Sequence, residues 1–267
     1  MDTAMGYDLR DPSKAHHPLV AGRVSLTAAH NVIHWGLCAL SVLAVLISTK
    51  LSPNPLYAVI CIFLWFVFGY AYNSGLSKES PLGFMSISVC YAMMAAWGWL
   101  LSHPELTPLG WIYVAYAFMT ILWQISYEGH LKELEAGERS NILVLLGARV
   151  EGGRFRGGWA GWLGGLLKVV HLGVGFLLLL MVFDFGRLAW FIVTCGASLY
   201  LTYEMVRDRP WVRDRELMRM SLQEIAVIYL PVPLLLDPVT SALLMLAGVV
   251  YFFGVNRAIW GKPHPAV

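Results

Sequence analysis

Long apolar runs, separated by short polar segments, dominate the pattern of this 267-residue chain. A helix needs about 20 apolar residues to cross the hydrocarbon core of a bilayer, because each residue advances it by about 1.5 Å. We predict spanning helices near residues 25–49, 56–72, 83–101, 108–126, 160–181, 186–205, 219–236 and 239–256. The seventh is the most polar, and it contains Pro231 and Pro233. The pattern predicts an all-α, polytopic membrane bundle of about eight transmembrane helices in a single domain, residues 1–267.

The composition agrees with a membrane protein. Hydrophobic residues make up 58% of the chain and charged residues 13%, whereas soluble domains carry about 25% charged residues. A net charge of +2, with no basic cluster interleaved with aromatics, gives no indication of a nucleic-acid partner. The cysteines lie in apolar runs without metal-ligand spacing, so we interpret them as small core residues rather than disulfides: Cys38, Cys61, Cys90 and Cys195.

The basic residues predict the orientation of the chain in a cell membrane. Lys and Arg concentrate in cytoplasmic loops, and with the N-terminus inside only Lys50, Lys168 and Arg187 of the 19 basic residues fall elsewhere. The N-terminal segment has no signal-peptide pattern, so we expect the first spanning helix to drive insertion. The N-terminal arm and the loops 73–82, 127–159 and 206–219 are then expected on the cytoplasmic face.

The longest polar interruption begins at Tyr127 and holds four glutamates between Glu128 and Glu138. A helix here would place two favourable i,i+4 pairs on one stripe, Glu128–Lys132 and Glu135–Arg139, worth about 0.2–0.5 kcal/mol each. One interpretation is therefore a solvated, salt-bridged helix. The other is chemistry on a charged ligand, for which Glu133 and Glu138 lie off the stripe.

Two other segments also allow more than one interpretation. In the loop after the sixth helix, Glu204 and Asp208 have a repulsive i,i+4 spacing unless a cation such as Arg207 or Arg209 lies between them. Contact of this basic loop with anionic lipid is favoured over a metal site. For the histidines of the apolar runs, hydrogen bonds to neighbouring helices are favoured over metal binding: His30, His34 and His171.

The N-terminal arm and the loop after the second helix hold further candidates. Asp8 and Asp11 are three residues apart before the first helix, either in a solvated tail or in a binding site. In the loop, Asn73 and Gly75 suit a helix end and Ser80-Pro81 suits a helix start. The helix-end interpretation gives no role to Tyr72 and Lys78.

In three places the chain resembles the UbiA superfamily of intramembrane prenyltransferases. Tyr7-Asp8-x-x-Asp11 followed by residues 17–23, HPLVAGR, is similar to the family's Asn-Asp-x-x-Asp motif and the Arg-Pro-Leu-x-Ser-Gly-Arg-like run after it. Tyr7 replaces the Asn, Ala15 stands where a further Asp is common, and His17 replaces the Arg. The family's first two helices have no counterpart here before the motif.

The other two similar segments follow in the family's order. Tyr72 and Lys78, before residues 80–83, SPLG, resemble a loop in which a Tyr and a Lys touch the diphosphate. Residues 132–135, KELE, through Leu146-Gly147 resemble the second acidic motif, with Glu where the family prefers Asp. The chain has four predicted helices after this motif, whereas the family has three.

The resemblance implies an enzyme with a central cavity open sideways to lipid. It implies that Mg²⁺ and an isoprenoid diphosphate bind at the cytoplasmic face, with a lipophilic acceptor as a further partner. The implied metal ligands are Asp8, Asp11, Glu133 and Glu135; the implied diphosphate contacts are Arg23, Tyr72, Lys78 and Lys132; and the implied catalytic residues are Asp8, Asp11, Tyr72, Lys78 and Glu133.

Three functions stay open from the sequence. Transfer of the prenyl group to an acceptor would make the protein a prenyltransferase, whereas intramolecular capture of the allylic cation would make it a terpene cyclase. A non-catalytic transporter or scaffold is the third. It would not need carboxylates and cations grouped on one face, and no transporter-type internal repeat is obvious.

Overall fold

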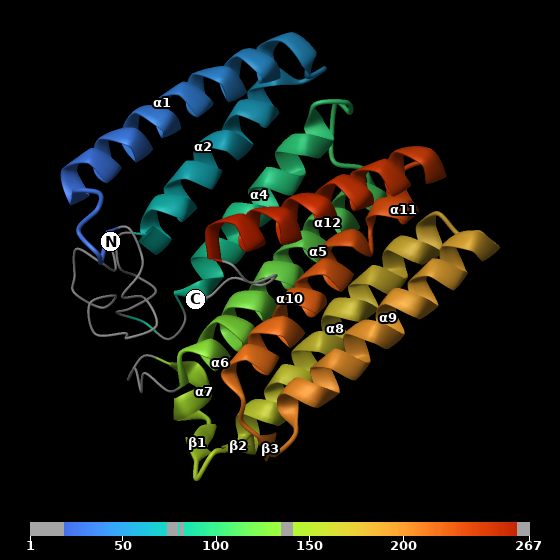
Figure 1. Ribbon diagram of the computed structural model, residues 1–267. Coiled ribbons are helices and arrows are strands. Elements are labelled where there is room, and N and C mark those ends of the chain that lie inside the picture. The colour runs from blue at the N-terminus through green and yellow to red at the C-terminus, as the bar shows by residue number, and fades with distance from the viewer. Residues whose placement is uncertain (1–18, 74–79, 81–82, 135–140, 261–267) are drawn as a thin grey trace. The chain divides into compact units, whose positions relative to one another are not determined.

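A computed structural model describes residues 19–73, 80, 83–134 and 141–260 (Figure 1). Packing of the chain separates two compact units, residues 1–114 and residues 115–266, which we call unit 1 and unit 2. Each is described by itself. Organisation as one domain over residues 1–267 therefore stays a prediction.

The described part of unit 1 consists mainly of three long helices, α1 (Leu26–Leu51), α2 (Pro55–Ala71) and α4 (Phe84–Leu100). Helix α2 packs along α4, and α1 packs against α2 (Figure 1). Polar side chains tie the helices together: Ser52 Oγ donates to the carbonyl of Leu100 at 2.6 Å, and Trp97 Nε1 donates to Ser48 Oγ at 2.8 Å. Both contacts are interhelical, which is how bundles in lipid satisfy buried polar groups.

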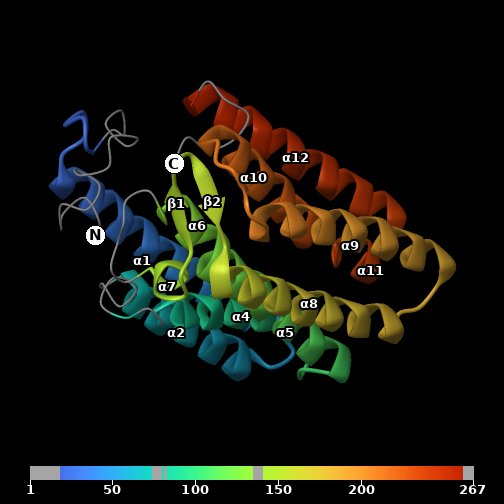
Figure 2. The same ribbon diagram turned by 90° about the horizontal axis from the view of Figure 1, so that it is seen from below.

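Unit 2 begins within α5 (Pro108–Trp123), which continues into the π-helix η4 (Gln124–Gly129) and the short α6 (His130–Lys132). The remaining elements are α7 (Ile142–Leu145), β1 (Arg149–Glu151), β2 (Arg154–Arg156), α8 (Gly158–Met181), α9 (Phe185–Val206), β3 (Arg209–Pro210), α10 (Arg213–Tyr229), α11 (Val232–Leu235) and α12 (Pro238–Trp260). Helix α9 packs against both α8 and α10 (Figure 2). The strands and α7 gather at one end of this bundle (Figure 1).

These elements confirm the predicted all-α, polytopic membrane bundle. Five described helical segments are long and apolar enough to cross a membrane: 26–51, 108–132, 158–181, 185–206 and 238–255. The shorter α2 and α4 are also apolar. The predicted seventh span differs, because α10 begins at Arg213 and a break at Pro231 separates it from α11. Proline removes a backbone donor. Three polar residues of α10 are buried, Glu216, Ser221 and Gln223, so the count of eight spans stays a prediction.

A small antiparallel sheet, ordered β1-β2-β3, was missed by the sequence analysis. Gly152 and Gly153 make its first turn with φ values of +55° and +69°, which suit the two-residue hairpin turn that glycine pairs favour. Phe155 in β2 is fully buried and lies under the guanidinium of Arg209, 4.3 Å from its ring centroid. The hairpin is therefore anchored to the loop that follows α9.

Exposed tryptophans mark the same end of unit 2. Trp159 and Trp162, in the first turns of α8, are 77% and 79% exposed. Indole rings favour the boundary between hydrocarbon and head groups, so these two residues are suited to the membrane interface. All four cysteines are free thiols, and Cys61 and Cys90 are buried as predicted. The interpretation as a core residue is wrong for Cys38, which is exposed.

The tight contact between α8 and η4 leads to a stability prediction. A Cβ added at Gly164 would clash with the ring of Tyr127, whereas one at Gly165 would meet nothing within 4 Å. Gly164→Ala should therefore lower the free energy of unfolding by about 1–3 kcal/mol, the usual cost of overpacking. Gly165→Ala is the matched control and should leave stability unchanged or slightly raised. Thermal unfolding in detergent checks this, and equal midpoints for the two variants would contradict the packing of Tyr127 on Gly164.

Candidate functional site

The second acidic segment has a buried first half. Glu128 lies in η4 and is only 3% exposed, whereas Lys132 and Glu133 are half-buried at the end of α6. The solvated, salt-bridged helix considered from the sequence is therefore wrong for Glu128, because η4 and a turn at Glu133 replace a continuous helix. Its second pair, Glu135–Arg139, lies outside the described residues.

Asn141 holds the backbone at the C-terminal end of this segment. Its Nδ2 donates to the carbonyl of His130 at 2.6 Å, and its Oδ1 accepts from the backbone N–H groups of Leu143 and Val144 at 2.9 and 3.3 Å. Asn141 thus caps α7 and also ties it to α6. The backbone on both sides of residues 135–140 is held in place, which positions Lys132 and Glu133.

Charged side chains from three helical elements of unit 2 interact around Glu128. They are Lys132 of α6, Lys168 of α8 and Glu224 of α10. Gln124, one turn before Glu128, donates to Glu224 Oε1 at 2.8 Å. Within the described part of the chain, Oε1 of Glu128 is buried without a hydrogen-bond partner. Since buried polar atoms are nearly always paired, this atom marks a place where a ligand, a water molecule or a proton would act.

A second polar group lies farther along α8. Lys168 and His171 are both fully buried, and His171 Nε2 lies 2.9 Å from Thr120 Oγ1 of α5. The predicted hydrogen bond between His171 and a neighbouring helix is therefore confirmed. His30 and His34 differ, because both are exposed on α1 and stack on one another, with ring centroids 6.2 Å apart.

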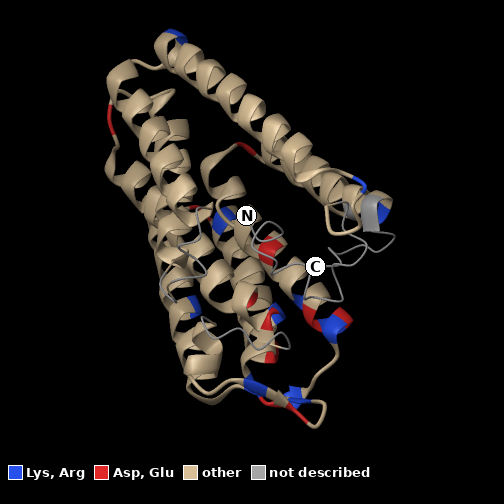
Figure 3. Ribbon diagram, turned by 90° about the vertical axis from the view of Figure 1, so that its left-hand side faces the viewer, with Lys and Arg blue, Asp and Glu red and all other residues tan. Residues whose placement is uncertain are grey.

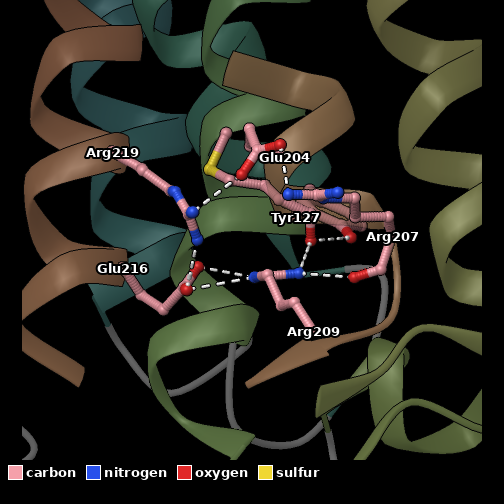
Figure 4. A network of polar contacts seen from close by, with 7 residues as sticks. Tyr127, Glu204, Arg207, Arg209, Glu216 and Arg219 are labelled. Atoms are coloured by element: carbon pink, nitrogen blue, oxygen red, sulfur yellow. Dashed lines mark hydrogen bonds and ion pairs between the residues drawn. The ribbon is translucent and has the colours of Figure 1, made fainter. Parts of the chain in front are cut away.

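An ion-pair network joins the loop after α9 to α10 (Figure 4). Buried Arg209 pairs with Glu216 through Nε and Nη2, and Arg219 then bridges Glu216 Oε1 at 2.7 Å and Glu204 Oε2 at 2.8 Å. Arg207 completes the network on Glu204 Oε1 at 2.6 Å. Across unit 2, acidic and basic residues gather toward the end that carries the strands (Figure 3).

This network changes the interpretation of the loop 206–219. Arg207 neutralises Glu204, as one sequence interpretation expected, but Arg209 turns inward to Glu216. Asp208 accepts from the backbone N–H of Gly157 at 3.0 Å and so joins the loop to the start of α8. The buried part of this loop holds the fold together, because Arg209 also donates to the carbonyls of Met205 and Arg207 at the end of α9.

The predicted site residues are distributed over both units. In unit 1, Arg23 is exposed before α1 and Tyr72 is half-buried at the end of α2. Lys132 and Glu133 lie together in unit 2, beside buried Glu128. Asp8, Asp11, Lys78 and Glu135 lie outside the described residues.

The described residues could bind Mg²⁺ only together with oxygen ligands from substrate phosphates and water. Among the residues that the structure describes, no three His, Cys, Asp or Glu side chains group closely enough to hold a metal ion. Mg²⁺ is usually held by one or two carboxylates together with substrate phosphates and water. Glu133 supplies an oxygen donor of that kind, and adjacent Lys132 is a cation suited to a phosphate, so the donor set suits a magnesium diphosphate.

Sequence reasoning missed the polar group formed by buried Lys168 and Gln223 and half-buried Glu224. One signal could have found it: a lysine in the middle of an apolar run of spanning length is costly and is usually functional. Lys168 was noted only as an exception to the charge bias. Glu224 carried the same signal, because it lies within the predicted span 219–236, where it counted only toward that run being the most polar.

A comparison of the chain with known protein families identifies its family. A model of the UbiA prenyltransferase family matches residues 5–228. No curated protein and no solved structure matches the chain. The family match includes all three motif segments, and the family consists of polytopic membrane enzymes of the prenyltransferase type, which generally use Mg²⁺ with diphosphate substrates. The chain therefore belongs to the UbiA prenyltransferase family.

Proposed function

We propose that this protein is an intramembrane prenyltransferase that ionises an isoprenoid diphosphate with Mg²⁺ and transfers the prenyl group to a lipophilic acceptor. The observation that carries the proposal is the family match over residues 5–228, which contains both acidic segments and the Tyr72–Lys78 loop between them. An anionic head on an apolar tail suits a site where a polar segment meets apolar helices.

The cationic and phenolic side chains of the motifs bind the diphosphate in this proposal. Lys132 stands in unit 2 next to Glu133, and Arg23, Tyr72 and Lys78 belong to unit 1. Positive groups placed where the leaving group gains charge stabilise the transition state more than the ground state. Lys78 and Lys132 therefore contribute to breaking the C–O bond as well as to binding.

The carboxylates of the motifs hold the metal: Asp8, Asp11, Glu133 and Glu135. When bound, Mg²⁺ supplies positive charge that neutralises the departing diphosphate. The carboxylates fix where that charge lies, and apolar helices around the prenyl tail keep water away from the allylic cation. Aromatic faces stabilise such a cation.

Orientation follows from the same proposal. The segments that bind the diphosphate share the face expected in the cytoplasm, so the N-terminus is placed there with the loops 73–82 and 127–159. The protein is then an integral membrane enzyme that takes its anionic substrate from the cytoplasmic leaflet.

Release of diphosphate tests the proposed function. Purified protein in lipid nanodiscs, given farnesyl or geranylgeranyl diphosphate, should release diphosphate with Mg²⁺ and should stop when EDTA is added. An Asp8→Asn/Asp11→Asn double variant is the negative control and should release no diphosphate. Lack of release from both substrates would contradict the proposal. A cyclic hydrocarbon in place of an acceptor adduct would identify a terpene cyclase.

A further inference from the structure

Lys168 is a fully buried lysine whose direct partners carry no negative charge. Its Nζ lies 3.5 Å from the centroid of the Trp123 ring and 3.5 Å from Nδ1 of His171. When the Gln223 amide is oriented with its oxygen toward Lys168, Oε1 accepts from Nζ at 2.8 Å and the amide nitrogen donates to the carbonyl of Ser198 at 3.1 Å. These contacts use the donors of the ammonium group without supplying a negative charge.

Glu128 has the complementary arrangement. It is almost fully buried in η4, its Oε1 has no hydrogen-bond partner among the described residues, and the charges that act on it come from Lys132, Lys168 and Glu224. Lys168 is the cation from the facing helix α8. The π-helix around Glu128 is a conformation often found at functional sites.

The ion pairs that stabilise the fold differ from Glu128 and Lys168, because their charged atoms are in direct contact. Arg219 meets Glu216 and Glu204 at 2.7 and 2.8 Å, and Arg209 binds both oxygens of Glu216. Glu128 and Lys168, both described, make no such direct contact and interact only at longer range. Oε1 of Glu128 is therefore a buried carboxylate oxygen that receives no hydrogen bond from the described residues.

We propose that Glu128 accepts the proton released on prenyl transfer and that Lys168 is the positioning residue that supplies its counter-charge. This inference rests on the proposed function. The C–O bond to diphosphate breaks, and its electron pair leaves with the diphosphate. A bond forms between the prenyl carbon and an electron pair of the acceptor. The hydrogen that the acceptor loses becomes a proton on Oε1 of Glu128.

This assignment narrows the class of acceptor. The acceptor must lose a hydrogen as a proton, so its reacting group carries an O–H, an N–H or an acidified C–H. That hydrogen reaches Glu128 directly or through one water molecule, as general base catalysis allows. Neither Glu128 nor Lys168 belongs to the motif residues that bind the metal and the diphosphate.

Turnover with a matched set of variants tests the proposal. Membranes containing the full chain are given Mg²⁺ and tritiated geranylgeranyl diphosphate, and label in solvent-extractable product is followed against pH. Glu128→Gln should lower turnover about 10²-fold or more, the scale of a lost general base, while binding of the labelled diphosphate is unchanged. Glu128→Asp should recover part of the loss. Glu151→Gln makes the same chemical change on the exposed hairpin and should match the wild type.

Lys168→Met separates positioning from mere packing. It should move the pH at which turnover is half-maximal, because Glu128 loses the cation that faces it, whereas a structural role would lower turnover equally at all pH values. An unchanged pH profile would overturn the role of Lys168. Turnover of Glu128→Gln within about threefold of the wild type would overturn the role of Glu128 and would leave a bridging water as the partner of Oε1.

Two further outcomes distinguish failure of the proposed function from failure of the role proposed for Glu128. Wild-type protein that neither binds nor consumes the diphosphate would refute the proposed function and, with it, this inference. Active wild-type protein with an active Glu128→Gln variant would refute this inference alone. If Glu128→Gln fails to accumulate, the Glu128→Asp variant and the pH profile of Lys168→Met decide, and wild-type behaviour of both would refute the inference.

Discussion

Asp11→Asn is expected to lower turnover by about 10²-fold or more while expression and thermal stability stay at the wild-type level. The change removes a negative charge but keeps the shape of the side chain. If Asp11 holds Mg²⁺ on the diphosphate, the leaving group then ionises without its main counter-charge, and one such electrostatic contact is worth about 10²–10³-fold. Diphosphate release from geranylgeranyl diphosphate, measured across Mg²⁺ concentrations, provides the result.

The same experiment distinguishes a metal ligand from a solvated tail. Raising the Mg²⁺ concentration should restore part of the loss, because weaker binding can be offset by mass action. Asp2→Asn makes the same change in the same segment, outside the motif, and should have no effect. A stable Asp11→Asn protein with full activity at low Mg²⁺ would show that the arm is only a tail, since exposed substitutions usually stay within about 0.5 kcal/mol.

Glu216→Ala is expected to destabilise the protein by about 3–5 kcal/mol, the cost of removing one partner from a buried ion pair. Glu216 is 1% exposed, and its carboxylate accepts from both Arg209 and Arg219. Truncation leaves the Arg209 guanidinium buried between Phe155 and the end of α9 without its counter-ion. Denaturant unfolding in detergent micelles measures the change.

Two controls test that explanation. Glu151→Ala removes an ion pair with Arg149 at 3.3 Å, but both side chains are more than half exposed, so the change should cost less than about 1 kcal/mol. The double change Arg209→Met/Glu216→Leu should recover much of the loss, because apolar residues of similar size often replace a buried pair without cost. Equal destabilisation by Glu216→Ala and Glu151→Ala would mean that the network adds no stability.

The sequence by itself determined the membrane class and most of the helices. Apolar runs of spanning length have only one stable conformation in lipid, because every backbone donor and acceptor must be satisfied within the segment. The helices α8 and α9 accordingly begin and end within a few residues of the predicted runs 160–181 and 186–205. The order of the three motif segments also indicated the family that the family model identifies.

The local sequence pattern did not predict the surroundings of side chains whose contacts come from residues distant in the sequence. The spacing of Glu128 and Lys132 allowed a solvated helix as one of two interpretations. In the structure, η4 turns Glu128 into the interior, where α8 and α10 supply surrounding charges. Arg209 looked like a surface cation at a membrane face, but Glu216 and Phe155 draw it inside. In both cases the surroundings come from helices that lie close only in the folded protein.

Lys168 shows most clearly what the sequence determined and what the tertiary structure determined. The sequence placed a lysine within an apolar run, which is costly in lipid, and so required a polar partner without identifying it. Only the packing of α5, α8 and α10 brought Trp123, His171 and Gln223 to its ammonium group and Glu128 within electrostatic range. The apolar pattern fixes which residues are helical because hydrogen bonding in lipid is local. Which polar groups meet inside the bundle depends on how the helices pack.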